Sequence, residues 1–137
     1  MTIVLDVVFK EIGDFIMVQA SSTTVGADAM NWVSVCDLDA IAPNTGVNAL
    51  IGTEQVAIFR IGETDEVYAT GNFDPFSKAF VMSRGIVGDR QGVLKVASPI
   101  YKQNFSLKTG VCLDDETIAL KVYPARVVDG QVQIGAS

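Results

Sequence analysis

The chain has 137 residues and a formal net charge of −6, so it has the length of one domain with its own core, and its acidity excludes nucleic acid as the default partner. It contains no histidine and only two cysteines, which excludes histidine-dependent catalytic triads, zinc sites with histidine and four-cysteine metal sites. Two distant cysteines do not make a secreted disulfide framework, and no apolar run is long enough for a membrane span, so we expect a cytoplasmic protein.

Residues 1–29 differ from the rest of the chain, and we interpret them as an N-terminal extension that ends in a linker. Small and polar residues form the linker at 20–29. Apolar residues between Leu5 and Phe15 recur at helical spacing, which predicts an amphipathic helix, although β-branched residues in the same segment would also suit a strand. Met30 could serve as an alternative start of the protein.

Residues 30–137 carry a dense series of strand signals. The strands are short, recur about every ten residues and are separated by turn residues, which predicts an all-β antiparallel sandwich or small barrel. Asp129–Gly130 is the strongest hairpin signal, because both central residues of a type I′ turn need a positive φ. The expected strands are Trp32–Val35, Val47–Leu50, Gln55–Ile61, Glu66–Thr70, Val93–Ala97, Asn104–Leu107, Ile118–Tyr123, Ala125–Val128 and Gln131–Ile134.

The strand pattern weakens between Phe73 and Gly92, where turn residues dominate. We therefore expect a long loop there. A long loop inside a compact domain is usually functional or a binding element.

Several phrases resemble a known family. They are Asp74–Pro75–Phe76, Ser83–Arg84–Gly85, Ser98–Pro99–Ile100–Tyr101, Phe105–Ser106–Leu107–Lys108–Thr109–Gly110 and a closing hairpin at Asp129–Gly130. Their order resembles the Rieske ferredoxin domain, in which Cys–Pro–His and Cys–Pro–x–His loops hold a [2Fe–2S] cluster. The resemblance extends from about Asn31 to Ile134.

The cluster ligands of that family do not match. The two cysteine positions are occupied by Asp74 and Ser98, and the two histidine positions by Phe76 and Tyr101. A Rieske cluster needs two thiolates on one iron and two imidazoles on the other. We therefore expect no cofactor and no metal in this chain.

The small subunits of assimilatory NAD(P)H-dependent nitrite reductases are a branch of this fold without the ligands. The chain resembles them in further phrases, such as Glu54–Gln55–Val56–Ala57–Ile58–Phe59–Arg60 and Tyr123–Pro124–Ala125–Arg126–Val127. The resemblance implies a non-catalytic accessory subunit whose large partner carries siroheme, [4Fe–4S] and FAD and reduces nitrite to ammonium in nitrate assimilation. The alternative is a free-standing interaction or regulatory module on the same fold.

The basic residues are concentrated in one segment. Residues 78–108 contain six bases and one acid, although the whole chain is acidic. Our hypothesis is that the loops of the former cluster site form a docking site for the large subunit, with apolar anchors in a basic rim. The competing interpretation is that Phe76, Phe80 and Tyr101 only fill the space of the cluster. The candidate docking residues are Phe76, Lys78, Phe80, Arg84, Arg90 and Lys102.

Overall fold

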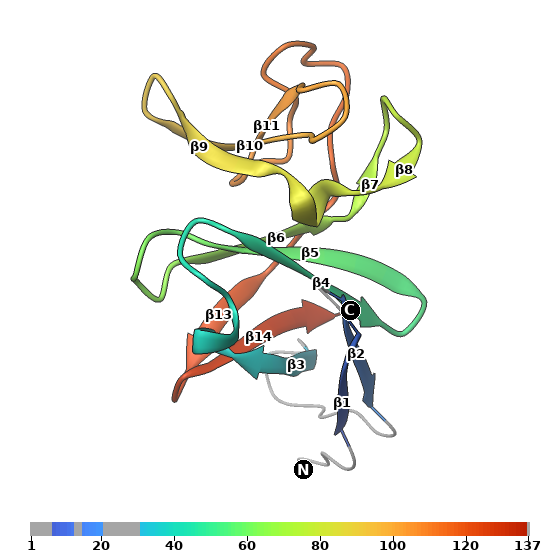
Figure 1. Ribbon diagram of the computed structural model, residues 1–137, viewed down its shortest axis with the longest axis vertical. Helices are drawn as coiled ribbons and strands as arrows, with labels where there is room; N and C mark the ends of the chain where they lie inside the picture. The colour runs from blue at the N-terminus through green and yellow to red at the C-terminus, as the bar shows by residue number, and fades with distance from the viewer. Residues whose placement is uncertain (1–6, 13–14, 21–30, 137) are drawn as a thin grey trace.

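The computed structural model describes residues 7–12, 15–20 and 31–136. In these residues the chain forms fourteen β-strands and two single turns of 3-10 helix, arranged as Figure 1 shows. This arrangement confirms the all-β class expected from the sequence. No helix in the described ranges is long and apolar enough to cross a membrane.

The largest sheet has six strands in the order β1–β2–β4–β5–β6–β12. Neighbouring strands are antiparallel, except that β2 runs parallel to β4. Strands β4 and β5 form an antiparallel hairpin and confirm the strands expected at Val47–Leu50 and Gln55–Ile61. The bounds of the six strands are Val7–Ile12, Phe15–Ala20, Gly46–Ile51, Glu54–Arg60, Val67–Gly71 and Val122–Tyr123.

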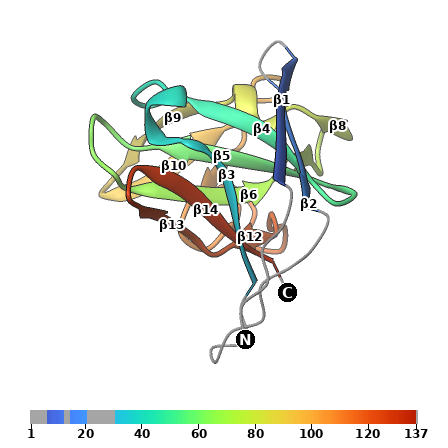
Figure 2. The ribbon, with the colours of Figure 1, turned by 90° about the horizontal axis from the view of Figure 1, so that it is seen from below.

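A three-stranded sheet of β13, β14 and β3 lies against one face of the large sheet (Figures 1 and 2). The turn between β13 and β14 confirms the predicted hairpin, since Asp129 has φ 51° and Gly130 has φ 77°. A 3-10 turn, η1, follows β3. The bounds are Ala125–Val128, Gln131–Ala136 and Asn31–Asp37 for the strands and Leu38–Ala40 for η1.

A smaller subdomain lies beyond the opposite face of the large sheet (Figure 1). It contains the sheet β9–β10–β11, the hairpin β7–β8 and the 3-10 turn η2. Three of these strands fall in the segment 73–92, so the expected continuous loop is wrong. Backbone pairing rather than apolar alternation defines them. The bounds are Phe73–Asp74, Ala79–Phe80, Ile86–Arg90, Val93–Ala97 and Asn104–Ser106 for β7 to β11, and Met82–Arg84 for η2.

Strand β5 is buried on both faces, because the large sheet is covered on both sides. Successive side chains of a strand point to opposite faces. Val56 and Ile58 therefore enter one core with β3 and β14, whereas Ala57 and Phe59 enter the other core with the small subdomain. All four side chains are 0% exposed. This double burial explains the continuous apolar run in the sequence of β5.

The N-terminal extension contains a β-hairpin, so the predicted amphipathic helix is wrong for residues 7–12 and 15–20. Strand β1 pairs with β2, and β2 pairs with the edge strand β4 from Phe15↔Asn48 to Val18↔Ile51. The β-branched and aromatic residues of Val7–Val8–Phe9 suit a strand. The open edge of β4 supplies backbone hydrogen-bond partners for β2, and the periodicity of the sequence alone does not reveal them. The predicted linker lies outside the described residues, apart from Ala20 at its first position.

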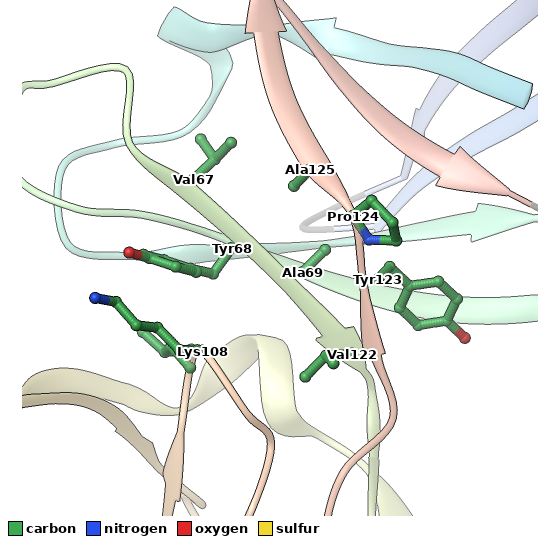
Figure 3. Close-up of a pocket in the computed structure, with 9 residues that line it drawn as sticks. Val67, Tyr68, Ala69, Lys108, Val122, Tyr123, Pro124 and Ala125 are labelled. Atoms are coloured by element: carbon green, nitrogen blue, oxygen red, sulfur yellow. The ribbon is translucent and has the colours of Figure 1, made fainter. Parts of the chain in front are cut away.

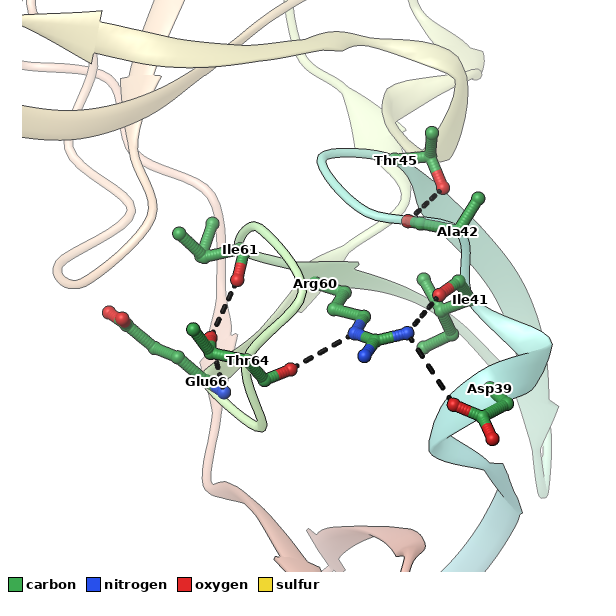
Figure 4. A network of polar contacts seen from close by, with 8 residues as sticks. All are labelled: Asp39, Ile41, Ala42, Thr45, Arg60, Ile61, Thr64 and Glu66. Carbon is green, nitrogen blue, oxygen red and sulfur yellow. Dashed lines mark hydrogen bonds and ion pairs between the residues drawn. The ribbon is translucent and has the colours of Figure 1, made fainter.

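A buried arginine fixes two loops beside the first core (Figure 4). Arg60 is 8% exposed, and its Nε and Nη1 donate hydrogen bonds of 3.0 Å to the carbonyl oxygens of Thr64 and Ile41. Its Nη1 also lies 3.8 Å from a carboxylate oxygen of Asp39, but the Asp39 side chain is 98% exposed. We infer that the buried hydrogen bonds hold the loops and that the ion pair contributes little.

We expect Arg60→Ala to lower the free energy of unfolding by about 2–4 kcal/mol, because it removes a buried side chain and leaves the buried carbonyl oxygen of Ile41 and the partly buried one of Thr64 without their donors. We expect Asp39→Ala to change it by less than about 0.5 kcal/mol. Urea denaturation of both variants measures the difference. Equal losses would contradict the assigned roles.

Candidate functional site

Asp74 and Ser98 bring two loops of the small subdomain together. Ser98 donates its hydroxyl to Asp74 Oδ2 at 2.6 Å, and both residues are 0% exposed. The hydroxyl of Ser77 donates to the same oxygen at 2.8 Å, and the backbone N–H of Phe76 donates to Oδ1 at 2.9 Å. The two positions that would carry cysteine in a cluster-binding relative are thus joined by a direct hydrogen bond.

The two loops have nearly the same conformation. In each loop, the polar side chain before a proline accepts a hydrogen bond from the backbone N–H two residues later. Asp74 accepts from Phe76, and Ser98 accepts from Ile100. In each, the backbone carbonyl of that residue accepts the N–H of a lysine four residues on, at 2.8 Å for Lys78 and 3.1 Å for Lys102. Both lysines have a positive φ, 61° and 66°. The loops are therefore two copies of one turn.

A buried asparagine and a glycine position these loops. Asn72, 1% exposed, accepts the N–H of Ser83 at 2.7 Å and donates to the Gln55 side chain at 3.1 Å, which ties β5 to η2. A Cβ on Gly85 would lie 2.5 Å from the carbonyl oxygen of Ala97, directly before Ser98. Only glycine permits this approach of η2 to β10.

The carboxyl group of Asp74 is held in its charged form. Burial raises its pKa, but hydrogen bonds from the Ser98 and Ser77 hydroxyls and from the backbone N–H groups of Phe76 and Ser77 outweigh burial, so the pKa lies below its ordinary value. The charge is balanced by oriented donors that the loops themselves supply.

The other predicted site residues separate into two groups. Phe76 turns inward, and its ring lies 6.0 Å from that of the buried Phe105. Arg90 stands at the far end of β9 and pairs with Asp114 at 2.8 Å. The remaining predicted residues are exposed beside the joined loops: Lys78, Phe80, Arg84, Tyr101 and Lys102.

Sequence reasoning missed three exposed apolar residues at the same place. Phe73 pairs with Phe80 across the β7–β8 hairpin, with ring centroids 5.1 Å apart. Ile86 pairs with Ala97 in the β9–β10 ladder, and Ile100 follows Ser98 by two residues. Phe73 and Ile86 lie in the segment 73–92 interpreted as loop, and Ile100 lies between Ser98 and Tyr101, so only their apolar character was visible in the sequence.

A pocket lies away from the joined loops, between β6 and the segment 122–125 (Figure 3). It is an open pocket of about 420 Å³, with valine and alanine side chains on its floor and Lys108 at its rim. The hydroxyl of Tyr68 at this pocket donates a hydrogen bond to Glu66, which with burial raises the pKa of Tyr68 to about 12. The hydroxyl of Tyr68 therefore stays protonated at neutral pH.

Two matching loops above a doubly covered antiparallel sheet define a Rieske-like domain. The family model for the Rieske-like [2Fe-2S] domain matches residues 31–135, and the chain belongs to that family. Within it, the chain belongs with the small subunits of NADH-dependent nitrite reductases.

Three relatives support this assignment. The nitrite reductase (NADH) small subunit of Escherichia coli is 52% identical over 103 residues, which are 75% of this chain and 95% of that protein. The solution structure of the E. coli protein NirD has a TM-score of 0.74 and 49% identity, and the match covers 79% of this chain and 98% of that one. A nitrite reductase [NAD(P)H] large subunit of Klebsiella oxytoca is 43% identical over 104 residues, 76% of this chain but 11% of that protein.

The residues at the ligand positions do not fit a Rieske cluster. Carboxylate, hydroxyl, phenyl and phenol groups do not supply two thiolates and two imidazoles. The hydroxyl of Ser98 and the carboxylate of Asp74 are instead hydrogen-bonded directly to each other at 2.6 Å. In the described part of the chain, no three His, Cys, Asp or Glu side chains form a group that could hold a metal ion.

We expect Asp74→Asn to lower the free energy of unfolding by about 1–3 kcal/mol at pH 7, because the amide cannot accept all of these hydrogen bonds. The folded-state pKa of Asp74 is lowered. Its stabilisation is therefore present above the unfolded pKa near 4 and is lost as pH falls through the folded pKa.

Urea denaturation of the wild-type chain and the variant at pH 7, 5 and 3 checks this expectation. The difference should shrink toward pH 3. The matched control is Asp129→Asn, in an exposed turn where asparagine is also favoured. It should leave the free energy of unfolding almost unchanged. A loss that is the same at pH 3 and pH 7 would show that the charge of Asp74 is irrelevant.

Proposed function

We propose that the chain is an accessory, non-catalytic subunit of an NAD(P)H-dependent nitrite reductase. A large partner with siroheme, [4Fe–4S] and FAD would reduce nitrite to ammonium, and this chain would support it by binding. The observation that carries the proposal is the 52% identity to a nitrite reductase small subunit over 95% of that relative.

The Klebsiella oxytoca relative supports the association with a large subunit. There, a segment similar to this chain is part of a much longer protein named as a nitrite reductase large subunit. A domain that occurs fused to a catalytic chain in one organism and separate in another is expected to bind that chain when it is separate. The fused form removes the need for affinity, so the separate form must supply it through a surface.

We propose further that the domain works without an iron–sulfur cluster. The donor chemistry at Asp74, Phe76, Ser98 and Tyr101 supports this. The buried charge of Asp74 also supports it, because four neutral hydrogen-bond donors already satisfy the oxygens of this carboxylate. A redox role of the chain itself would need a cluster at these loops.

Co-purification tests the accessory role. We expect the tagged chain, expressed with its large subunit in cells that grow on nitrate, to elute with a siroheme protein and its nitrite reductase activity. Deletion of the chain should abolish or strongly reduce NAD(P)H-dependent nitrite reduction in extracts, and added purified chain should restore it. If the chain elutes alone and its deletion leaves nitrite reduction intact, a free-standing interaction or regulatory module is the better assignment.

Anaerobic reconstitution tests the absence of a cluster. We expect the purified chain, treated with iron and sulfide and then desalted, to retain no stoichiometric iron and no visible [2Fe–2S] absorption. A Rieske ferredoxin treated in parallel is the positive control. Two iron atoms per chain together with the absorption bands would overturn the proposal of a cluster-free subunit.

A further inference from the structure

The exposed apolar side chains are concentrated around the two joined loops. In the described residues, eight large apolar side chains are more than a third exposed. Five of these belong to the small subdomain near Asp74 and Ser98: Phe73, Phe80, Ile86, Ile100 and Tyr101. Phe80, Ile86 and Tyr101 are the most exposed of all, at 56%, 60% and 61%. We call these five residues the apolar tip.

Backbone contacts bring together the segments that carry the apolar tip. Phe73 and Phe80 are in ring contact on the β7–β8 hairpin. Strand β7 of that hairpin ends at Asp74, whose carboxylate accepts a hydrogen bond from the hydroxyl of Ser98. Ser98 follows Ala97, the partner of Ile86, and is followed closely by Ile100 and Tyr101. The hydrogen bond between the loops therefore joins the three segments that carry the apolar side chains.

Basic side chains border the apolar tip. Lys78 and Lys102 occupy the same place in the two matching loops, each with a positive φ, and both are exposed. Arg84 is exposed on η2, two residues before Ile86. The chain as a whole carries a net charge of −6. An apolar centre with a rim of one charge is the usual composition of a protein-binding surface, and here its charge is opposite to that of the whole molecule.

The ends of the domain lie away from the apolar tip. Asn31 and Ala136 pair with each other in the β3–β14 ladder, so both ends leave the domain together. Figure 1 shows that sheet at the opposite end of the molecule from β7–β11. The similar segment of the Klebsiella oxytoca relative is part of a longer chain. A connection through these two ends would leave the tip uncovered.

We propose that the apolar tip is the surface that binds the large catalytic subunit, and that it fits an apolar patch of that subunit bordered by acidic side chains. This inference rests on the proposed function. A second copy of this chain is a poorer occupant, because two tips facing each other would bring lysine rims of like charge together. We leave Phe76 and Arg90 out of the proposed surface. Phe76 packs inward against Phe105, and Arg90 is paired with Asp114 at the other end of β9.

Binding measurements with the purified full-length chain and its large subunit test the proposal. We expect Tyr101→Ala and Phe80→Ala each to weaken the Kd by about tenfold or more, because exposed aromatic anchors dominate protein interfaces. Phe73→Ala should also weaken binding. Its control is Val128→Ala, because Val128 on β13, at the other end of the molecule, has the same 39% exposure as Phe73. This variant should leave the Kd within about twofold.

Charge reversal tests the rim. We expect Lys78→Glu to slow association by about three- to tenfold at low salt and to lose this effect at high salt, where screening is strong. Lys108→Glu makes the same charge change in the same basic segment but beside the pocket of Figure 3, and it should have little effect. Thermal unfolding of each variant shows that the fold is kept.

The outcomes separate the two proposals. If the wild-type chain binds the large subunit and the tip variants bind equally well, or if Val128→Ala weakens binding as much as Tyr101→Ala, the tip is not the interface and only this inference fails. If the wild-type chain does not bind the large subunit, the proposed function fails and this inference falls with it. Concentration-dependent dimers that Tyr101→Ala abolishes would assign the tip to a second copy and overturn the proposal.

Discussion

The burial of β5 on both faces is the constraint on which the rest of the structure depends. A strand with apolar side chains on both sides must be covered twice, and this chain covers it with two separate cores. One core closes against β3 and β14 and the other against the small subdomain. Because Phe59 and Ala57 of the same strand face that subdomain, its loops are anchored to the centre of the molecule. The segments that carry the site residues are therefore packed against the buried centre of the molecule.

Above that strand, a hydrogen bond between Ser98 and Asp74 joins the two loops of the small subdomain. In a Rieske protein the metal cluster links the two loops covalently through its ligands. Here the hydroxyl of Ser98 reaches the carboxylate of Asp74, and local donors satisfy the remaining carboxylate positions. A buried charge is costly unless it is hydrogen-bonded, so the loops must keep their turn geometry to keep the charge satisfied. The turn geometry of the two loops and the charge of Asp74 thus depend on each other.

Much of the fold was visible in the sequence, and the exceptions have physical causes. Long strands such as β5 and the hairpin at Asp129–Gly130 were predictable because apolar pattern and turn chemistry agree there. The hairpin of β1 and β2 was missed because its periodicity also suits a helix and only the open edge of β4 decides between them. Strands β7 and β8 were missed because each has only two residues. Strand β9 was missed because none of its side chains is fully buried, so it is defined by pairing with β10. Topology is a tertiary property, and local patterns do not contain it.

The candidate site follows the same division. The identity of the four substituted ligand positions could be read from the sequence, but the direction of each side chain could not. If the loops only had to fill the space of a cluster, their apolar side chains would be expected to turn inward, where burial stabilises the fold. Phe76 does so against Phe105. Ile100 and Tyr101, in the matching loop, remain 44% and 61% exposed. The two matching turns thus direct their apolar side chains differently, Phe76 to the core and Ile100 and Tyr101 to solvent. Filling the space of a cluster explains the inward side chain but not the two exposed ones.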